Sequence, residues 1–413
     1  MAGTSLHMTA PRPQTGTPIY AVFGEIDPTA PDLTALATSL RPIPFDVLVA
    51  LETGRPAIRD EALAAVRALD KRPLAGATSL DDYWNGALFA LNPGFPLAGP
   101  RALAVDKGAL YTHLRERKVT VPDFLIGTLT PDLLAEAAGT LGAAPILKPA
   151  TGTGSSGVVR YREDLSPADN LELYRITLRL AQIDSSTPII AMRYVGGPEA
   201  LEVSAELVVD AGTCVSTVVH EKGSATHLPP YLDRIMTSPP THPSILAARP
   251  ALDESLAALV AALELGRGVV HAELRLDDGR WHVLDVAVRP GGGLVTHSVH
   301  ARTGFDPHLL QLLACLGLPF PERAPARPRF PATAIACCYA ANPAGTDLAR
   351  LHAFAGVLES DPAVIGWHLS ADRSRDVLFG PDAGLSIGVG APAVHLAREK
   401  LAELIGPPGF TAT

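Results

Sequence analysis

The residues whose types and spacing could do chemistry begin in a glycine-rich segment, residues 145–161. An apolar run at 145–147 indicates a buried strand that Lys148 ends, and residues 151–157 then hold three glycines and four hydroxyl residues. Glycine lets a backbone approach a ligand closely and present its amides to an anion, and lysine adds a point charge for phosphate. Strand formers at 158–161 follow. The segment predicts a flap that closes over a triphosphate, with an ordinary Gly/Ser hairpin turn as the alternative.

Two common nucleotide motifs can be tested against the same loop. Gly152, Gly154 and Gly157 match G-x-G-x-x-G. The dinucleotide fingerprint, however, needs a helix that opens at the third glycine, whereas Val-Val-Arg-Tyr after Gly157 favours a strand. The phosphate loop G-x-x-x-x-G-K-[ST] is absent, because no lysine follows Gly157. A nicotinamide-dependent oxidoreductase is therefore only a minor alternative, which a lack of NAD binding would remove.

A second dense segment, residues 268–293, combines carboxylates, a histidine and arginines on two expected strands with a turn at 278–279. Period-two alternation puts one polar set on a single face of each strand. These residues are His271, Glu273 and Arg275 on the first strand, and Asp285, Ala287 and Arg289 on the second. In a hairpin, Glu273 and Asp285 can become cross-strand neighbours. Two carboxylates and an arginine suit Mg²⁺ that bridges phosphates, with Arg289 on the transferred group; the alternative is a charged hairpin facing solvent.

Lysine is unusually informative in this chain, because only six of the 34 basic residues are lysines. A lysine at a given position suggests a need for a compact ammonium rather than a guanidinium fork. Glu202, Ser204 and Glu206 alternate with apolar residues, which puts the two acids on one face of a strand; a solvated sheet face is the alternative. The polar stretch from 223 to 240 is a long loop of the kind that tends to be functional.

The elements that must position these residues follow from periodicity and turn signals. Strands are expected at 19–24, 45–50, 145–147, 158–161, 188–195, 202–210, 213–219, 268–276, 280–289, 332–340 and 364–369. Helices are expected at 60–69, 102–117, 130–142, 166–184, 253–266, 348–358 and 391–405. Lys107 lies in the middle of the second of these helices. The fold class is α/β (α+β).

Five regions are expected along the chain. They are a disordered lead-in at 1–16, an N-terminal α/β domain at 17–98, a first nucleotide-binding subdomain with the flap at 99–187, a second with the catalytic residues at 188–325, and a C-terminal α+β subdomain at 326–413.

Composition excludes several classes of protein. The net charge of −9 argues against nucleic acid or a membrane surface as the main partner. No apolar run approaches the ~20 residues of a membrane span, and the N-terminal residues have no apolar core that would mark a signal peptide. The four cysteines lack metal spacing, and Cys337-Cys338 lies in an apolar run, which favours a reducing compartment. We expect a cytoplasmic protein that acts on small molecules.

Together, these segments resemble the ATP-grasp superfamily, in particular its carboxylate–amine ligases of the L-amino-acid ligase (dipeptide synthetase) type. The resemblance covers about residues 95–315 and rests on the order of the motifs. A helix lysine (Lys107) precedes a strand lysine with a Gly/Ser flap, then a strand–loop–strand hinge with an acid, then H-x-E at 271–273, and last D-x-x-x-R-P-G-G-G at 285–293. Each motif is weak alone, and the order and spacing make the set specific.

The resemblance implies an ATP-grasp fold with an N-terminal pre-ATP-grasp domain, and it implies a role for each matching residue. The ATP-binding residues would be Lys107, Lys148, Thr153, Gly154, Ser155, Ser156, Gly157, Arg193, Tyr194, Val195 and Glu202. Glu273 and Asp285 would hold Mg²⁺, with Mn²⁺ as a substitute. Arg289, Gly292, Gly293 and Lys148 would be catalytic, and Lys222, His271, Arg289, Gly291 and Gly292 would contact the substrate. A homodimer is a further implication of the family likeness.

The chain departs from the family pattern at three places. Met192 and Arg193 stand where acids are usual at the hinge, which leaves the adenine contact to main chain. Asp285 and Ala287 stand where the pattern reads E-x-N, so the carboxylate arm is shorter and one oxygen ligand is missing. An insertion at 198–201 means that the role given to Glu202 could belong to Glu199.

The function that the resemblance implies is an ADP-forming ligase that activates a small carboxylate, expected to be an amino acid, and joins it to an amine, expected to be another amino acid. A composition rich in Ala, Arg and Pro suggests a high-GC genome and a setting in secondary metabolism, such as antibiotic biosynthesis. The alternatives are a carrier-protein or intramolecular acceptor with the same chemistry, and a nucleotide-binding protein without turnover, which Ala287 motivates.

Overall fold

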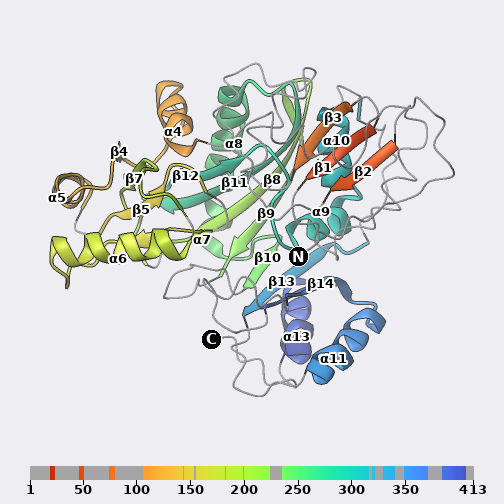
Figure 1. Ribbon diagram of the computed structural model, residues 1–413. Coiled ribbons are helices and arrows are strands. Elements are labelled where there is room, and N and C mark those ends of the chain that lie inside the picture. Colours follow the sequence, from red (N-terminus) through yellow and green to blue (C-terminus); the bar gives the residue numbers. More distant parts are fainter. Residues whose placement is uncertain are drawn as a thin grey trace.

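The computed structural model describes residues 19–23, 46–50, 74–79, 106–142, 144–152, 155–181, 183–198, 200–223, 235–315, 319–320, 329–339, 348–370 and 384–405. Within these residues the strands form three sheets (Figure 1). A small parallel sheet has the order β2-β1-β3, with β1 at Ile19–Phe23, β2 at Asp46–Ala50 and β3 at Leu74–Ser79. Its parallel pairing is that of the N-terminal α/β unit expected from the sequence.

The largest sheet has eight strands in the order β12-β11-β8-β9-β10-β13-β15-β14, and every neighbouring pair is antiparallel. Their bounds are β8 Glu202–Asp210, β9 Thr213–Lys222, β10 Ile235–Ser238, β11 Arg267–Asp277, β12 Arg280–Ala287, β13 Ala332–Tyr339, β14 Val364–Ser370 and β15 Gly384–Ala391. Because β13 pairs with β10, the strands expected in a separate C-terminal unit continue the same sheet.

The two faces of the β12-β11-β8-β9 part of this sheet differ in chemistry. One face packs on helix α8 (Arg249–Leu263), where alternate residues of β8 such as Val203, Ala205 and Leu207 meet Leu252, Leu256 and Leu259. Trp281 of β12 is buried in the same core and donates a hydrogen bond from its indole to the Ala248 carbonyl oxygen, 3.0 Å away. The burial of this face leaves the opposite face, with its polar residues, as the one that can meet a ligand.

A four-stranded antiparallel sheet lies beside the large one, in the order β4-β7-β5-β6 (Figure 1). Its strands are β4 Phe124–Gly127, β5 Ile146–Pro149, β6 Val159–Arg160 and β7 Ile189–Met192. Helices α5 (Pro131–Thr140) and α6 (Pro167–Leu180) cover it with Leu134, Tyr174 and Leu178. Both helices start with a capping hydroxyl followed by proline, Thr130-Pro131 and Ser166-Pro167, as the sequence indicated for the first.

Helix α4 (Lys107–Glu116) joins the two sheets. Its Tyr111 packs among Phe124, Ile190 and Met192 of the small sheet, whereas its Leu110 and Leu114 belong to the core around α8. The helix begins at Lys107 because Asp106 caps it by accepting from the Ala109 amide. The expected position of Lys107 in the middle of a helix is therefore wrong: it lies in the first turn, which faces the large sheet.

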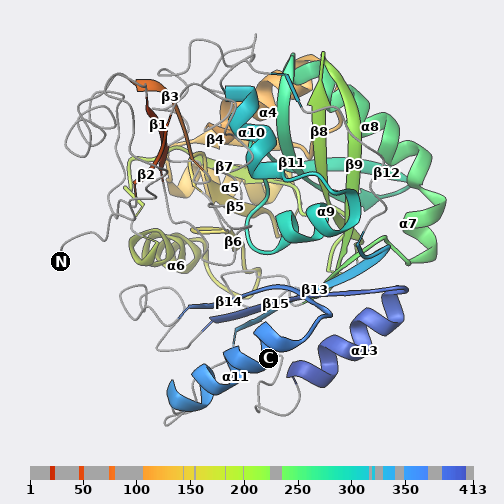
Figure 2. The same cartoon turned by 90° about the vertical axis from the view of Figure 1, so that its right-hand side faces the viewer.

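The remaining helices are α7 (Pro243–Ala247), α9 (Val295–Thr303), α10 (Pro307–Cys315), α11 (Leu348–Ser360) and α13 (Val394–Ile405). They pack at different places, with α7 against α8, α10 against β11, and α9, α11 and α13 against the β13-β15-β14 part of the large sheet. Figure 2 shows α11 and α13 on one side of β13-β15-β14, and α9 on the other. Strands β3, β4, β10 and β15 and helices α7, α9 and α10 were not among the strands and helices expected from the sequence. The expected helix at 60–69 and the lead-in at 1–16 lie outside the described residues. Among the described helices, none combines the length and apolarity needed to cross a membrane.

Candidate active site

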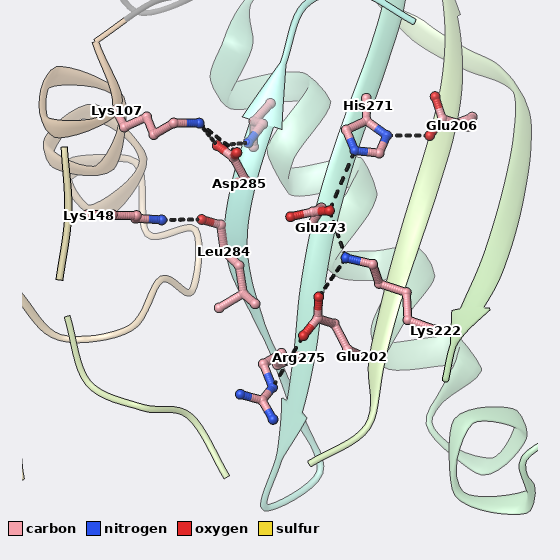
Figure 3. A network of polar contacts seen from close by, with 11 residues as sticks. Lys107, Lys148, Glu202, Glu206, Lys222, His271, Glu273, Arg275, Leu284 and Asp285 are labelled. Atoms are coloured by element: carbon pink, nitrogen blue, oxygen red, sulfur yellow. Dashed lines mark hydrogen bonds and ion pairs between the residues drawn. The ribbon is translucent and has the colours of Figure 1, made fainter. Parts of the chain in front are cut away.

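A row of polar side chains crosses the open face of the large sheet, as Figure 3 shows. The register places Glu273 of β11 opposite Asp285 of β12 and opposite Ser204 of β8. His271 and Arg275 lie two residues away on either side, opposite Glu206 and Glu202. The expected cross-strand pairing of Glu273 with Asp285 is confirmed, and the row shows that acids from three strands share one face.

A β-bulge at Leu284 brings Asp285 to this face. The pairing shifts between Glu273 and Leu274, so that Leu274 pairs with Val283 and Leu284 has no partner on β11. Val283 before the bulge and Val286 after it both pack in the core around α8. Without the extra residue, period two would turn Asp285 toward that core. The bulge thus exposes the carboxylate of Asp285 and, two and four residues later, Ala287 and Arg289 to the same side.

The carbonyl of the bulged residue is itself a contact point for the flap lysine. The ammonium of Lys148 donates to the Leu284 carbonyl oxygen at 2.9 Å and to the hydroxyl of Tyr111, which also donates to that carbonyl. Burial is the main reason that the pKa of Lys148 falls to about 8, against the raising effect of Asp285. Lys148, from the small sheet, therefore sits over the hairpin of the large one.

Each of the two expected metal-binding carboxylates has a lysine partner. Lys107 donates to both oxygens of Asp285, at 2.5 and 2.6 Å. Lys222 lies between Glu273 and Glu202, 2.7 Å from each, and its side chain is only 6% exposed. Burial would raise the pKa of both Glu273 and Asp285, but Lys222 and His271 lower the first and Lys107 and Lys148 lower the second. Both acids are thus held as carboxylates.

The chemistry of this donor set fits Mg²⁺. Magnesium in phosphate-transfer sites is usually held by one or two carboxylates together with substrate phosphates, rather than by a cage made only of protein. Glu273 and Asp285 supply two such carboxylates on opposed strands. Within the described residues, no group of three or more His, Cys, Asp or Glu side chains is arranged to hold a metal without further ligands. A metal here would consequently depend on a phosphate-bearing ligand.

His271 continues the row on the other side of Glu273. Its Nε2 lies 3.8 Å from Glu273 Oε1, and its Nδ1 is hydrogen-bonded to Glu206. Burial would lower the pKa of His271, but the charge of Glu206 and the hydrogen bonds to Glu206 and Glu273 raise it to about 10. The imidazole is therefore an imidazolium between two carboxylates.

Comparison with solved structures gives the fold its identity. An L-amino acid ligase from Bacillus licheniformis is 17% identical with a TM-score of 0.71, and the match covers 95% of this chain and 98% of that one. A carboxyaminoimidazole ribonucleotide synthase from Aspergillus clavatus, solved with ATP, is 18% identical with a TM-score of 0.67 over 95% and 98% of the two chains. An N5-carboxyaminoimidazole synthetase from Staphylococcus aureus, solved with ADP, is 14% identical with a TM-score of 0.62 over 95% and 98%.

The chain has the ATP-grasp fold. The similarity extends over nearly the whole length of each chain. No protein-family model matches the sequence, and neither does any curated protein. At these identities, the assignment of residue roles within the ATP-grasp fold rests on the geometry of this chain.

The structure brings most of the residues expected in the ATP-grasp site together. Figure 3 shows three sets of contacts side by side: Lys107 with Asp285, Lys148 with the Leu284 carbonyl, and a chain from Glu202 through Lys222 and Glu273 to His271. Arg289 and Gly291 follow β12, and Gly291 joins the network through Glu206. Gly292 and Gly293 lie beyond, in the exposed turn before α9. Thr153 and Gly154 of the flap and Glu199, the alternative to Glu202, lie outside the described residues.

The expected hinge lies directly after β7. The ring of Tyr194 contacts two guanidinium groups. Its centroid lies 5.1 Å from Cζ of Arg160 in β6 and 4.8 Å from Cζ of Arg275 in β11. Arg275 in turn lies 3.6 Å from Glu202, so the hinge and the acid expected at the ribose are connected. Arg193 points to another partner, because it forms an ion pair with Asp277 at 2.9 Å. Val195 is buried. The segment expected to meet adenine thus lies at the edge of the polar row.

Sequence reasoning missed two residues of this site. The sequence placed Glu206 on the same face of a strand as Glu202. That shared face was the signal that Glu206 also belongs to the site, but no role was assigned to it. Tyr111 carries no signal in the sequence, because a tyrosine on the apolar face of a helix is indistinguishable from a core residue. Its hydroxyl bridges Lys148 and the Leu284 carbonyl.

The end of the flap offers a test of its conformation. Gly157 has φ = +75°, and a Cβ there would lie 3.0 Å from Ile183 Cδ1 and 3.2 Å from Pro149 Cδ. We expect Gly157→Ala to lower the free energy of unfolding by about 1–3 kcal/mol, because both the dihedral and the contacts oppose a side chain. Urea unfolding measures the effect. Gly139→Ala in α5, where nothing lies within 4 Å of the added Cβ, is the control and should be neutral or stabilising.

Proposed function

We propose that the chain is an ATP-dependent, ADP-forming ligase that activates a small carboxylate, an amino acid or a close relative, and joins it to an amine. The single observation that carries this proposal is the opposed pair Glu273 and Asp285, flanked by lysines from three different elements. Two carboxylates with several cations suit the binding of a metal–triphosphate complex. The ATP-grasp fold and its similarity to an L-amino acid ligase and to a carboxyaminoimidazole ribonucleotide synthase support the same class.

The first step is the transfer of a phosphoryl group. An oxygen of the substrate carboxylate attacks the γ-phosphorus, the bond between that phosphorus and the β–γ bridging oxygen breaks, and ADP leaves with the bonding electrons. Lys107 and Lys148 neutralise phosphate charge, and Arg289 stabilises the charge that develops on the transferred group. Glu273 and Asp285 would hold Mg²⁺, which would further neutralise the phosphates.

The second step forms the amide. The amine nitrogen attacks the carbonyl carbon of the acyl phosphate, the bond from that carbon to the phosphate oxygen breaks, and inorganic phosphate and a proton are released. The amides of Gly292 and Gly293, beside Gly291, whose own amide donates to Glu206, would hold the carbonyl oxygen in the carboxylate pocket as it gains charge. The flap predicted from the sequence would keep out water, which would otherwise hydrolyse the acyl phosphate.

The proposal is tested by incubating the protein with ATP, Mg²⁺ and pooled amino acids, with ADP, AMP and new masses as readouts. We expect ADP together with a condensed product whose mass names both substrates. AMP would indicate an adenylate and contradict the acyl-phosphate route. ADP with no condensed product would direct the search to the alternative acceptors, a carrier protein or an amine within the same molecule.

A second candidate, a nucleotide-binding protein without turnover, is favoured by one observation. Ala287 pairs with His271 next to the opposed carboxylates, at the position where an oxygen-bearing side chain is usual in the family pattern. If the parent binds ATP but forms neither ADP nor AMP, and Ala287→Asn gains turnover, this candidate replaces the ligase. If the parent turns over, the two carboxylates suffice and the candidate is excluded.

The lowered pKa of Lys148 predicts a pH dependence of nucleotide affinity. Only the ammonium form attracts phosphate, and with a pKa of about 8 this form is complete below pH 7 and is lost as the pH rises through 8. We expect the Kd for ATP to rise above pH 8, at a limiting rate of roughly tenfold per pH unit. Calorimetric titration between pH 6.5 and 9.5 measures the Kd. Lys148→Arg keeps its charge over this range and should flatten the profile; an equally steep profile in that variant would assign the effect to another group.

A further inference from the structure

Glu206 is the most deeply buried acid of the polar row, and no role has been given to it so far. It lies on β8 with 2% of its surface exposed. One carboxylate oxygen is bonded to His271 Nδ1, and the other accepts a hydrogen bond from the Gly291 amide at 3.1 Å. A buried carboxylate is costly unless such partners satisfy it. Its two partners come from β11 and from the loop that follows β12, so a single side chain ties two parts of the site together.

The fit around Gly291 is close enough to require glycine. A Cβ built on Gly291 would lie 2.7 Å from His271 Nδ1 and 2.8 Å from Glu206 Oε1, closer than real Cβ contacts. The φ of Gly291 is not in the left-handed region, so its backbone would accept alanine. The requirement therefore comes from the carboxylate–imidazole pair pressed against the backbone, and the pair and the loop hold each other in place.

We propose that Glu206 is a positioning residue for the substrate carboxylate: it fixes the Gly291 amide and the His271 ring, and so sets the pocket that Gly291–Gly293 line. The inference rests on the proposed function, since it deepens the account of the same site. Glu206 itself does not touch the substrate, because its two oxygens are engaged with His271 and Gly291. Glu206 contacts neither Lys107 nor Lys148, which are proposed to bind the phosphates, and it reaches Glu273 only through His271, so the larger effect is expected on the carboxylate.

Kinetics of Glu206→Gln and Glu206→Asp separate positioning from a general structural effect. Glutamine has one acceptor oxygen for two donors, and aspartate keeps the charge but is too short to hold both partners. We expect either variant to raise KM for the carboxylate by about tenfold or more, with KM for ATP within about twofold. A KM for the carboxylate in Glu206→Asp that equals the parent's would mean that charge alone matters. An equal rise in the KM values for the carboxylate and for ATP would mean a general loss of structure. Either result overturns the proposal.

Glu221→Gln is the matched control. Glu221 lies on β9 and, like Glu206, accepts from backbone amides, those of Thr241 and His242 at 2.6 and 2.9 Å. It lies on the opposite face of β9 from His220 and Lys222, away from the polar row. The same chemical change should leave both KM values unchanged. A rise in carboxylate KM in this variant too would show that any lost carboxylate has that effect.

Gly291→Ala and a double variant test the contact from the other side. We expect Gly291→Ala to reproduce the carboxylate KM of Glu206→Gln. The double variant Glu206→Ala/Gly291→Ala should be about as defective as the worse single variant, because both changes break one pair. Additive losses would show two independent contacts and contradict the proposal.

Hydrogen exchange at the Gly291 amide keeps the inference testable without turnover. We expect protection in the parent and its loss in Glu206→Gln while β8 and β11 stay protected. If no substrate supports ADP formation, the proposed function fails, yet retained protection in Glu206→Gln would still refute the positioning contact separately. Two results together support both the proposed function and the positioning role. The Gly291 amide loses protection in Glu206→Gln but not in the parent, and the active variant has a raised KM for the carboxylate with an unchanged KM for ATP.

Discussion

Replacing Arg289 by methionine is expected to lower kcat by on the order of 10³-fold while the Kd for ATP changes little. The reason is that an arginine aimed at a transferring phosphoryl group acts on charge that develops in the transition state, where such groups contribute about 10³–10⁵-fold. Arg289 is 8% exposed, follows β12 on the same face as Asp285, and donates to the Pro290 carbonyl oxygen at 2.8 Å. A buried guanidinium in this place is hard to explain as a surface charge.

Two variants make the Arg289 result interpretable. Arg289→Lys keeps the charge but loses the planar fork, so we expect it to recover only a small part of kcat. Arg267→Met removes an arginine from the far end of β11, where it pairs with Asp210 at 2.7 Å, and should leave kcat unchanged. A normal kcat in Arg289→Met, with ADP still formed, would remove Arg289 from the phosphoryl-transfer step.

The second large effect is expected for Glu273→Gln. This change removes one of two carboxylates proposed to hold Mg²⁺, and it also removes the ion pair of Glu273 with Lys222. We expect kcat/KM for ATP to fall at least about 100-fold, and the Mg²⁺ concentration needed for half-maximal rate to rise. Initial rates over a range of Mg²⁺ at fixed ATP give both values.

Asp285→Asn should behave in the same way, because Asp285 faces Glu273 across the hairpin. Glu221→Gln again serves as the control from outside the polar row. If Glu273→Gln kept the parent's Mg²⁺ requirement, Glu273 would not bind the metal, and its role would be the structural contact with Lys222 and His271.

Those parts of the site that follow from local periodicity could be predicted from the sequence. The faces of the 268–293 hairpin follow from alternation, and the strand before the flap follows from its apolar run and Lys148. Local signals also gave the start of α5 within one residue, through Thr130 and Pro131. These features depend on residues close together in the chain, where one pattern decides the conformation.

What could not be predicted depends on long-range contact. The bulge at Leu284 could not be placed from the sequence, because Val283, Leu284 and Val286 are all apolar and any of them could face the core. The contact of Glu206 with Gly291 joins positions 85 residues apart. The separation of 178 residues between Lys107 and Asp285 is larger still. The continuation of the large sheet into β13-β15-β14 likewise depends on pairing between strands far apart in the sequence, such as β10 with β13, which propensity cannot predict.

The central claim, activation of a carboxylate as an acyl phosphate, is tested most directly by isotope transfer. The amino acid that supports ADP formation is supplied with ¹⁸O in its carboxylate, together with ATP, Mg²⁺ and the amine, and the released phosphate is examined by ³¹P NMR. The account predicts one ¹⁸O atom in each inorganic phosphate, because the phosphate leaves with the oxygen that attacked it. Unlabelled phosphate formed alongside labelled amide product, or label recovered in AMP, would contradict it.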